Sequence, residues 1–206
     1  PDGSARIAGS LRSGEGTLNI DGSLGWQGDD TPLVLNLRGT NVLASDTRDL
    51  RAVANPELTV RYAAKQPLNV TGKVTIPSAR IDLERLDQGV SVSEDVVVLD
   101  PVNPEDTGSS PLELDLTLAV GDEVRLNGFG LEGKLGGQMR VRSRPGREMT
   151  ANGALNIEGR YTAYGQKLQI TRGNLNWNNG PVSDPILDVR AEREVGRTQR
   201  VLRSHG

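Results

Sequence analysis

The chain contains no cysteine. This absence excludes disulfide bridges, thiolate metal sites and a cysteine nucleophile. Histidine is almost as scarce, because the single one, His205, is the penultimate residue. A catalytic triad, a histidine general base or a histidine metal site would therefore depend on a chain terminus, and termini are usually poorly ordered. The sequence predicts a protein that is not an enzyme and holds no cofactor or metal.

Aromatic residues are also few, at 3% of 206 residues, and hydrophobic residues reach only 35%. Globular proteins average about 45–50% apolar residues, although that figure also counts glycine. A core built on large rings is excluded, so we expect a folded protein with much surface for its mass. No apolar run approaches the roughly 20 residues of a membrane-spanning helix. The sequence opens Pro1-Asp2-Gly3 without a signal-peptide pattern, and we expect a piece of a longer protein.

An excess of basic charge is absent as well, because the formal net charge is −3. Binding to nucleic acid phosphates needs a concentrated basic surface, so we expect no nucleic-acid partner. Two runs of arginine do occur: Arg140, Arg142, Arg144 and Arg147, and then Arg190, Arg193, Arg197, Arg200 and Arg203. Neither run has the stacking aromatics of a nucleic-acid platform. We interpret both as solvated strand faces, with anionic lipid headgroups or an acidic partner as the alternative.

The sequence does contain a strong alternation of apolar and polar residues. Leu112-Glu113-Leu114-Asp115-Leu116-Thr117-Leu118-Ala119-Val120 gathers its aliphatic side chains on one face of a strand, whereas a helix would spread them around its circumference. Similar segments include 33–37, 58–62, 68–70, 74–76, 81–83, 168–170 and 187–189. We count roughly fifteen strands spaced about ten residues apart, as in all-β chains. The only segment that suggests a helical turn is 45–53.

A seven-residue repeat accompanies the alternation. Gly16-Thr17-Leu18-Asn19-Ile20-Asp21-Gly22 recurs as Gly153-Ala154-Leu155-Asn156-Ile157-Glu158-Gly159, and looser copies begin at Gly72, Gly137 and Gly173. A glycine before a short alternating strand suggests a bulge or a tight turn between neighbouring strands. Units stacked in this way form a long sheet in which each contacts mainly its neighbours. A glycine-bounded alternating strand is also common in any β protein, and the loose copies allow that interpretation.

A proline-rich segment interrupts the pattern of strands. Asp100-Pro101-Val102-Asn103-Pro104-Glu105-Asp106-Thr107-Gly108-Ser109-Ser110-Pro111 cannot continue a ladder of hydrogen bonds. We therefore predict a first curled sheet segment over residues 1–100, a loop or linker over 101–111, and a second β segment over 112–206.

One motif suggests a cofactor and is rejected. Gly128-Phe129-Gly130-Leu131-Glu132-Gly133 follows a predicted strand and matches the dinucleotide-binding fingerprint. That fingerprint functions only where a helix begins, so that the helix N-terminus faces the pyrophosphate. The adjacent glycines Gly136 and Gly137 oppose a helix, so we interpret the motif as a glycine-rich turn.

Almost every predicted strand has one apolar face, and the chain offers too few helices to cover it. Two sheets packed as a sandwich would bury these faces. Alternatively, one sheet curls on itself and its apolar face becomes a trough. A transmembrane barrel requires aromatic girdles and an apolar outer band, which the low aromatic content and charges such as Arg61, Arg125 and Arg142 oppose.

Several segments together resemble a known family. In order along the chain they are Gly16–Leu18, Val70–Pro77, Val92–Asp100, Leu112–Asp115, Val124–Leu126, Gly128–Leu131, Leu135–Gly137, Gly159–Ile170, Gly173–Leu175 and Pro185–Ala191. The most specific is the Tyr-x-x-Tyr-Gly-Gln pattern of Tyr161–Gln166. The series is similar to the C-terminal region of the TamB family, the translocation and assembly module subunits within the AsmA-like group, and covers most of residues 14–193.

The resemblance implies a periplasmic protein of Gram-negative bacteria that is anchored in the inner membrane and reaches the outer membrane. It implies a long U-shaped sheet with an aliphatic inner surface, no enzymatic activity, and a TamA-like outer-membrane barrel protein as partner. The implied roles are assembly of outer-membrane proteins and transport of phospholipid. Two departures are Trp177, where the family usually has Phe, and the arginine-rich end at Gly206, where the family continues through further strands.

The sequence and the resemblance together lead to two hypotheses. In the first, an all-β sheet of short amphipathic strands, curled into a U without substantial helix, shelters phospholipid acyl chains or unfolded outer-membrane protein strands against its hydrophobic inner face. In the second, free sheet edges act as templates for strands of barrel proteins. The predicted groove residues are Leu18, Ile20, Leu24, Trp26, Val60, Val70, Ile76, Leu114, Leu116, Leu118, Leu155, Ile157, Leu168, Ile170, Leu175, Trp177, Leu187 and Val189.

Overall fold

The computed structural model describes residues 3–28, 31–86 and 112–193. These residues form one open sheet, and strands account for 79% of them. In chain order the elements are β1 (Ser4–Ser13), β2 (Gly16–Gly25), β3 (Leu33–Thr40), β4 (Val42–Asp46), β5 (Leu50–Tyr62), β6 (Leu68–Asp82), α1 (Leu83–Leu86), β7 (Leu112–Gly128), β8 (Leu131–Ser143), β9 (Thr150–Ala163), β10 (Gln166–Pro181) and β11 (Ile186–Arg193).

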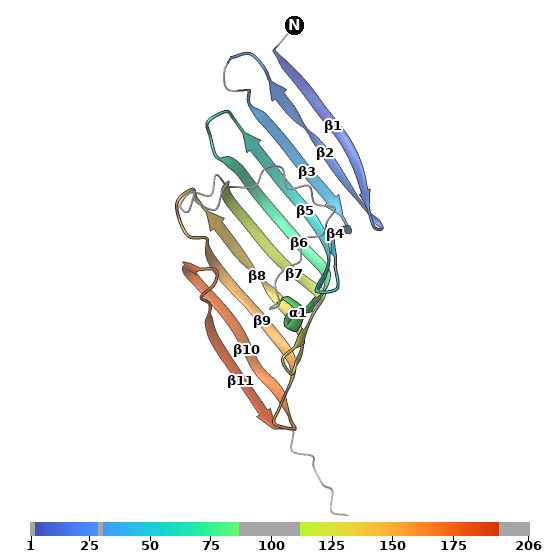
Figure 1. Ribbon diagram of the computed structural model, residues 1–206, viewed down its shortest axis with the longest axis vertical. Coiled ribbons are helices and arrows are strands. Elements are labelled where there is room, and N and C mark those ends of the chain that lie inside the picture. Colours follow the sequence, from blue (N-terminus) through green and yellow to red (C-terminus); the bar gives the residue numbers. More distant parts are fainter. Residues whose placement is uncertain (1–2, 29–30, 87–111, 194–206) are drawn as a thin grey trace, which may run out of the picture.

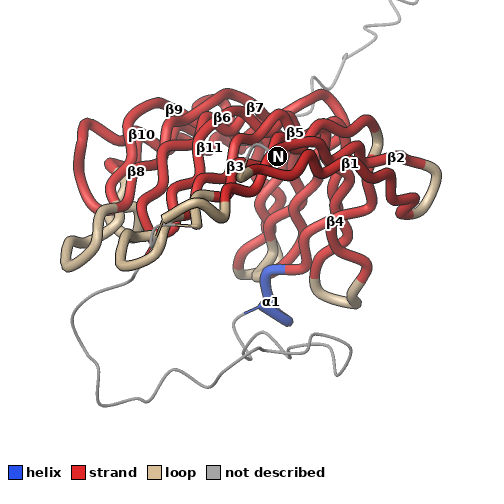
Figure 2. Tube along the Cα trace, turned by 90° about the horizontal axis from the view of Figure 1, so that it is seen from above, coloured by secondary structure: helices blue, strands red, loops and turns tan. Residues whose placement is uncertain are grey.

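The strands follow one another across the sheet almost in chain order. The path is β1-β2-β3-β5-β6-β7-β8-β9-β10-β11, and the short strand β4 pairs with β5 beside it (Figure 1). Neighbouring strands lie about 4.8 Å apart, so the sheet extends roughly 43 Å from β1 to β11. Viewed along this long direction, the strands arch and α1 lies beneath the arch (Figure 2). The predicted curled all-β sheet is confirmed.

A parallel pair joins the two halves of the chain. β6 and β7 pair from Leu68 with Leu112 to Asp82 with Asn127, while the other pairs of described strands are antiparallel. Parallel neighbours need a long crossover connection, because the chain must return to the same end of the sheet. The proline-rich segment 101–111 belongs to this connection and lies outside the described residues. The strands before and after it therefore share one sheet.

The described strands are longer than the alternation suggests. The described residues contain eleven strands, whereas the expectation of about fifteen was for the whole chain. The segments 68–70 and 74–76, which read as separate strands, both lie on β6, and this strand also includes Ile81. Gly72 continues the strand between them at φ 138°, a backbone conformation that favours glycine. The polar residues and the glycine between these two apolar segments therefore do not end the strand.

The predicted helical turn over 45–53 is wrong. Residues 42–46 belong to β4, and β5 begins at Leu50. The Thr47 amide donates to the Leu50 carbonyl at 3.0 Å, and the Leu50 amide donates to Thr47 Oγ1 at 3.1 Å. Hydroxyl side chains that bond to nearby backbone groups favour turns over helices, so this segment closes a hairpin. Within the described ranges, the only α-helix is the four-residue α1.

The glycine motifs have two structural roles. Phe129 and Gly130 form the turn between β7 and β8, which confirms the predicted glycine-rich turn. Gly16 also follows a hairpin turn, at the start of β2. Gly153, its counterpart in the repeat, instead lies inside β9 in regular pairing with Met139. The prediction of a turn or bulge is therefore wrong at Gly153. Glycine is needed at this position because a Cβ there would lie 2.6 Å from the Gln138 carbonyl oxygen.

Candidate functional site

The pairing of strands defines one apolar face, which we call the inner face. Residues directly opposite each other on neighbouring strands have side chains on the same side of the sheet. One row of paired residues, which we call the central row, crosses nine strands and reads Gly9, Ile20, Leu37, Leu58, Gly72, Leu116, Val141, Ala151 and Gly180. Every member is aliphatic or glycine. The strands therefore present a continuous hydrocarbon surface rather than isolated apolar patches.

Parallel rows extend this face on both sides. They are Ile7, Gly22, Leu35, Val60, Val70, Leu114 and Ser143; Val74, Leu118, Met139, Gly153 and Trp177; Ile76, Val120, Gly137, Leu155, Leu175 and Leu187; and Leu50, Ile81, Leu126, Gly133, Gly159, Ile170 and Ala191. The helix α1 packs on this face, because a Cβ on Gly128 would lie 2.9 Å from Leu83 Cβ. The inner face is thus the side beneath the arch in Figure 2.

The predicted groove residues fall into these rows or into shorter rows parallel to them, with one exception. Leu18 pairs with Leu11 and Gly39, Leu24 with Ala5 and Leu33, Ile157 with Leu135, Leu168 with Tyr161, and Val189 with Gly173. The others belong to the rows given above. Trp26 instead lies just beyond β2 and is 55% exposed. The structure therefore brings the strand residues of the set together on one face.

Several residues of this face were missing from the prediction. Leu35, Leu37 and Leu58 lie in alternating segments of the sequence, so the same periodicity could have identified them. Met139 and Val141 are each 7% exposed, but their strand also contains two adjacent glycines and alternating arginines, which obscured its apolar side. Ala151 is 2% exposed and has no sequence signal of its own, because its burial depends on the neighbouring strands.

The inner face is only partly shielded from water. Its buried cluster consists of Met139, Val141, Ala151 and Trp177, against which Leu114, Leu118, Leu155, Leu175 and Val182 pack. Many of the other aliphatic side chains of the face are half-buried, as in β2 and β7. At the β11 edge, Leu187 is 64% exposed and Val189 58%. An apolar surface of this extent that remains accessible is typical of a binding surface.

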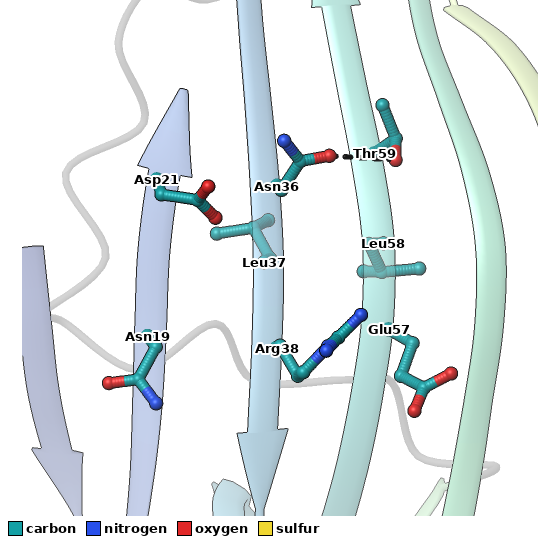
Figure 3. A pocket seen from close by; sticks show the side chains of 8 residues that line it. All are labelled: Asn19, Asp21, Asn36, Leu37, Arg38, Glu57, Leu58 and Thr59. Carbon is teal, nitrogen blue, oxygen red and sulfur yellow. Dashed lines mark hydrogen bonds between the residues drawn. The ribbon is translucent and has the colours of Figure 1, made fainter. Parts of the chain in front are cut away.

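The opposite, outer face is polar. Asn19, Asp21, Asn36, Arg38, Glu57 and Thr59 from β2, β3 and β5 surround a shallow hollow of about 430 Å³ (Figure 3). Thr59 Oγ1 donates to Asn36 Oδ1 at 3.1 Å. Leu37 and Leu58 also line the hollow, and its other lining residues are polar or charged. This arrangement fits a solvated strand surface.

The shortest ion pair among the described residues also lies on the outer face. Arg140 donates from Nε to Asp115 Oδ1 at 2.7 Å and from Nη2 to Asp115 Oδ2 at 2.6 Å. These hydrogen bonds from Arg140, helped by the positive charges of Arg140 and Arg142, hold the pKa of Asp115 below its ordinary value of 3.8. Both side chains are exposed, at 40% and 47%. The pair therefore links β7 and β8 at the surface.

We expect Asp115→Asn to change the acid side of the stability profile slightly. A carboxyl with a lowered pKa in the folded state stabilises it above the unfolded-state pKa and loses this effect as the pH falls through the folded value. The variant should melt about 2 °C or less below the unaltered chain at pH 7, because exposed pairs contribute little. The difference should vanish below the folded-state pKa of Asp115, and thermal melts from pH 7 to pH 2 measure it.

The matched control for this pair is Asp188→Asn. Asp188 approaches Arg172 through a single contact of 3.7 Å, without the two short hydrogen bonds of Asp115. We expect its melting temperature to follow that of the unaltered chain. Equal pH profiles for Asp115→Asn and the unaltered chain would contradict the role of the Arg140 hydrogen bonds.

Comparison with known proteins finds a family match for this chain. The family model of the TamB C-terminal domain matches residues 6–203. The chain belongs to the TamB family. One curated relative, the translocation and assembly module subunit TamB of Haemophilus influenzae, is 27% identical over 207 residues. The match covers 93% of the chain and 16% of that TamB protein, so the chain spans about a sixth of its relative's length. No helix in the described part of this TamB-family domain has the length and apolarity needed to cross a membrane.

Proposed function

We propose that this domain acts without enzymatic chemistry in the cell envelope, where its inner face shelters phospholipid acyl chains or unfolded outer-membrane protein strands and so supports outer-membrane biogenesis. Membership of the TamB family and the relative's name, a translocation and assembly module subunit, support a role in such a module. In this proposal the longer protein lies in the periplasm, anchored in the inner membrane, and works with a TamA-like barrel protein at the outer membrane.

The observation that carries the proposal is the central row, in which every residue from Gly9 to Gly180 across nine strands is aliphatic or glycine. Burying one methylene contributes about 0.8 kcal/mol, so a long acyl chain placed along the inner face gains up to roughly 10 kcal/mol. This gain is large enough to hold a lipid without a polar contact. A hydrocarbon wall of similar side chains also has no preferred register, so an acyl chain can slide along it.

Site-specific photocrosslinking in cells that carry the full-length protein tests the proposal. A photoreactive residue at Ile20, Leu58 or Leu116 should couple to phospholipid, because all three lie in that row. The same residue at Asn19 or Thr59 should not, because these side chains line the hollow of the outer face. Equal lipid coupling from both faces would contradict the proposal.

The end strands of the described sheet are the basis of a second candidate, strand templating for barrel proteins. Every residue of β11 is exposed, and β1 and β11 lie at opposite ends of the described sheet. An edge strand offers unpaired N–H and C=O groups to an incoming strand. If the domain acts as a strand template, photoreactive residues on β11 should couple to unfolded barrel proteins. Photoreactive residues at inner-face positions on β5 and β7 should then couple to nothing.

A further inference from the structure

A separate apolar hollow lies at one rim of the inner face, and we call it the rim pocket. It has a volume of about 360 Å³ and is lined by Leu83, Phe129, Ile157, Ile170, Val189 and Ala191, with Tyr161 beside them. Small-molecule sites typically measure about 300–1,000 Å³ and are mostly hydrophobic. The rim pocket therefore has the size and the lining of a site for a hydrocarbon chain.

The helix α1 contributes Leu83 to the lining of the rim pocket, and hydrogen bonds hold this helix in place. The Phe129 amide donates to Glu84 Oε1 at 2.8 Å, and this bond ties α1 to the turn between β7 and β8. The Asp82 amide donates to the Asp49 carbonyl at 2.9 Å. A helix of four residues is not stable alone, so these contacts determine where Leu83 lies. Figure 1 shows α1 beside the end of β7.

The mouth of the rim pocket exposes apolar side chains to water. Phe129 and Val189 are each 58% exposed, and Tyr161 is 39% exposed. Phe129 also has φ 51°, which costs a bulky residue free energy and which Gly or Asn would adopt more easily. Such strain is common at ligand sites. Exposed apolar side chains gathered around a hollow indicate a surface that an apolar ligand covers.

One cation shares the inner face with residues of the rim pocket. Arg193 pairs with Leu168, in the row Gly128, Leu131, Tyr161, Leu168 and Arg193 at the end of the strands. It therefore shares a face with Ala191 and Val189, two and four residues earlier on β11. Of the paired residues of the described strands that lie on the inner face, Arg193 is the only charged one.

We propose that the rim pocket binds one acyl chain of a phospholipid and that Arg193 binds the phosphate of its headgroup. A guanidinium recognises phosphate through charge-assisted hydrogen bonds, and the hydrocarbon lining accepts the chain. The apolar pocket and the adjacent cation thus match the two parts of an anionic amphiphile. This inference rests on the proposed function and specifies its substrate class. The pocket and Arg193 would also fix one end of the lipid, whereas the uniform rows of the inner face offer it no fixed position.

The test compares two photoactivatable lipids with the same acyl chains, phosphatidylglycerol and uncharged diacylglycerol, on the purified full-length protein in detergent. The unaltered protein should be labelled on β11 roughly tenfold more by phosphatidylglycerol, as one charge-assisted contact allows. Arg193→Ala should reduce that labelling roughly tenfold, to the diacylglycerol level. Arg190→Ala is the control, because Arg190 pairs with Arg172 on the outer face. Excess inorganic phosphate should not displace the lipid.

A second variant tests the hollow itself. Ala191→Trp should fill it and remove labelling by both lipids, and an edge strand tolerates tryptophan well. Glu192→Trp adds the same bulk to the outer face, where Glu192 pairs with Gln169, and should be labelled normally. Equal labelling by the two lipids, unchanged labelling of Ala191→Trp, or coupling of a photoreactive residue at Val189 to residues 87–111 of the same chain would each overturn the inference.

The two proposals fail separately. Leu116 lies in the central row and does not line the rim pocket. If Leu116→Arg stops lipid transfer while Ala191→Trp leaves labelling of β11 unchanged, the proposed function stands and the rim pocket is wrong. If Leu116→Arg leaves transfer intact while Arg193→Ala removes the phosphatidylglycerol preference, the rim pocket stands alone as a lipid site.

Discussion

Leu116→Arg and Ile157→Arg should each stop acyl chains from passing along the inner face. Leu116 pairs with Gly72 and Val141 in the central row, and Ile157 pairs with Leu135 and also lines the rim pocket. A cation placed on this hydrocarbon wall costs several kcal/mol to desolvate when a lipid tail covers it. We expect the domain still to fold, because an open trough lets the long arginine side chain reach water. Lipid photocrosslinking and envelope integrity in cells with the full-length variants measure the effect.

The matched controls place arginine on the outer face. Thr71→Arg lies next to Gly72 on β6, and its new side chain faces Asp115 on the neighbouring strand. Asn156→Arg immediately precedes Ile157 on β9 and pairs with Asn174 on the exposed side. Both controls should transfer lipid as the unaltered protein does. If an inner-face variant reaches normal abundance and carries lipid equally well, the conduit model fails and strand templating becomes the better explanation.

Trp177→Ala should lower the free energy of unfolding by about 3–5 kcal/mol, the usual cost of removing a large aromatic side chain from a core. Trp177 is 8% exposed and packs in the cluster with Met139, Val141 and Ala151. Gly153 lies directly opposite on β9 and leaves room for the indole ring. Because Gly153 has no side chain to fill the space, removal of the ring should leave a cavity. Urea denaturation of the 206-residue chain gives the free energy of unfolding.

Two further variants separate the contributions of Trp177. Trp177→Phe keeps most of the ring packing but loses the hydrogen bond from Nε1 to the Val182 carbonyl, 3.0 Å long, so it should cost about 1 kcal/mol. Trp26→Ala removes the other tryptophan, which is 55% exposed, and should cost less than about 1 kcal/mol. Equal losses for Trp177→Ala and Trp26→Ala would contradict the assignment of Trp177 to the core.

The fold class follows from local periodicity, and so does most of the candidate site. Leu114, Leu116 and Leu118 alternate with polar residues, and in a strand this spacing alone places them on one face. The repeat correctly identified two strands of similar pattern, β2 and β9. The error over residues 45–53 had a local cause too, because Thr47 bonds to Leu50 across a turn. Spacing alone does not separate a tight hairpin from a helical turn.

The sequence alone determined that the strands are amphipathic, that one face is aliphatic, and that the chain contains no thiol chemistry. Only the tertiary structure decided which strands are neighbours, because pairing joins residues far apart in the chain, as in the parallel contact of Gly72 with Leu116. That pairing aligns the separate apolar stripes into continuous rows. It also places Leu83, Phe129 and Ala191 around one hollow, with Arg193 two residues beyond Ala191 on the same face of β11. Periodicity acts within a strand, whereas a binding site depends on register between strands, which hydrogen bonding across the whole sheet sets.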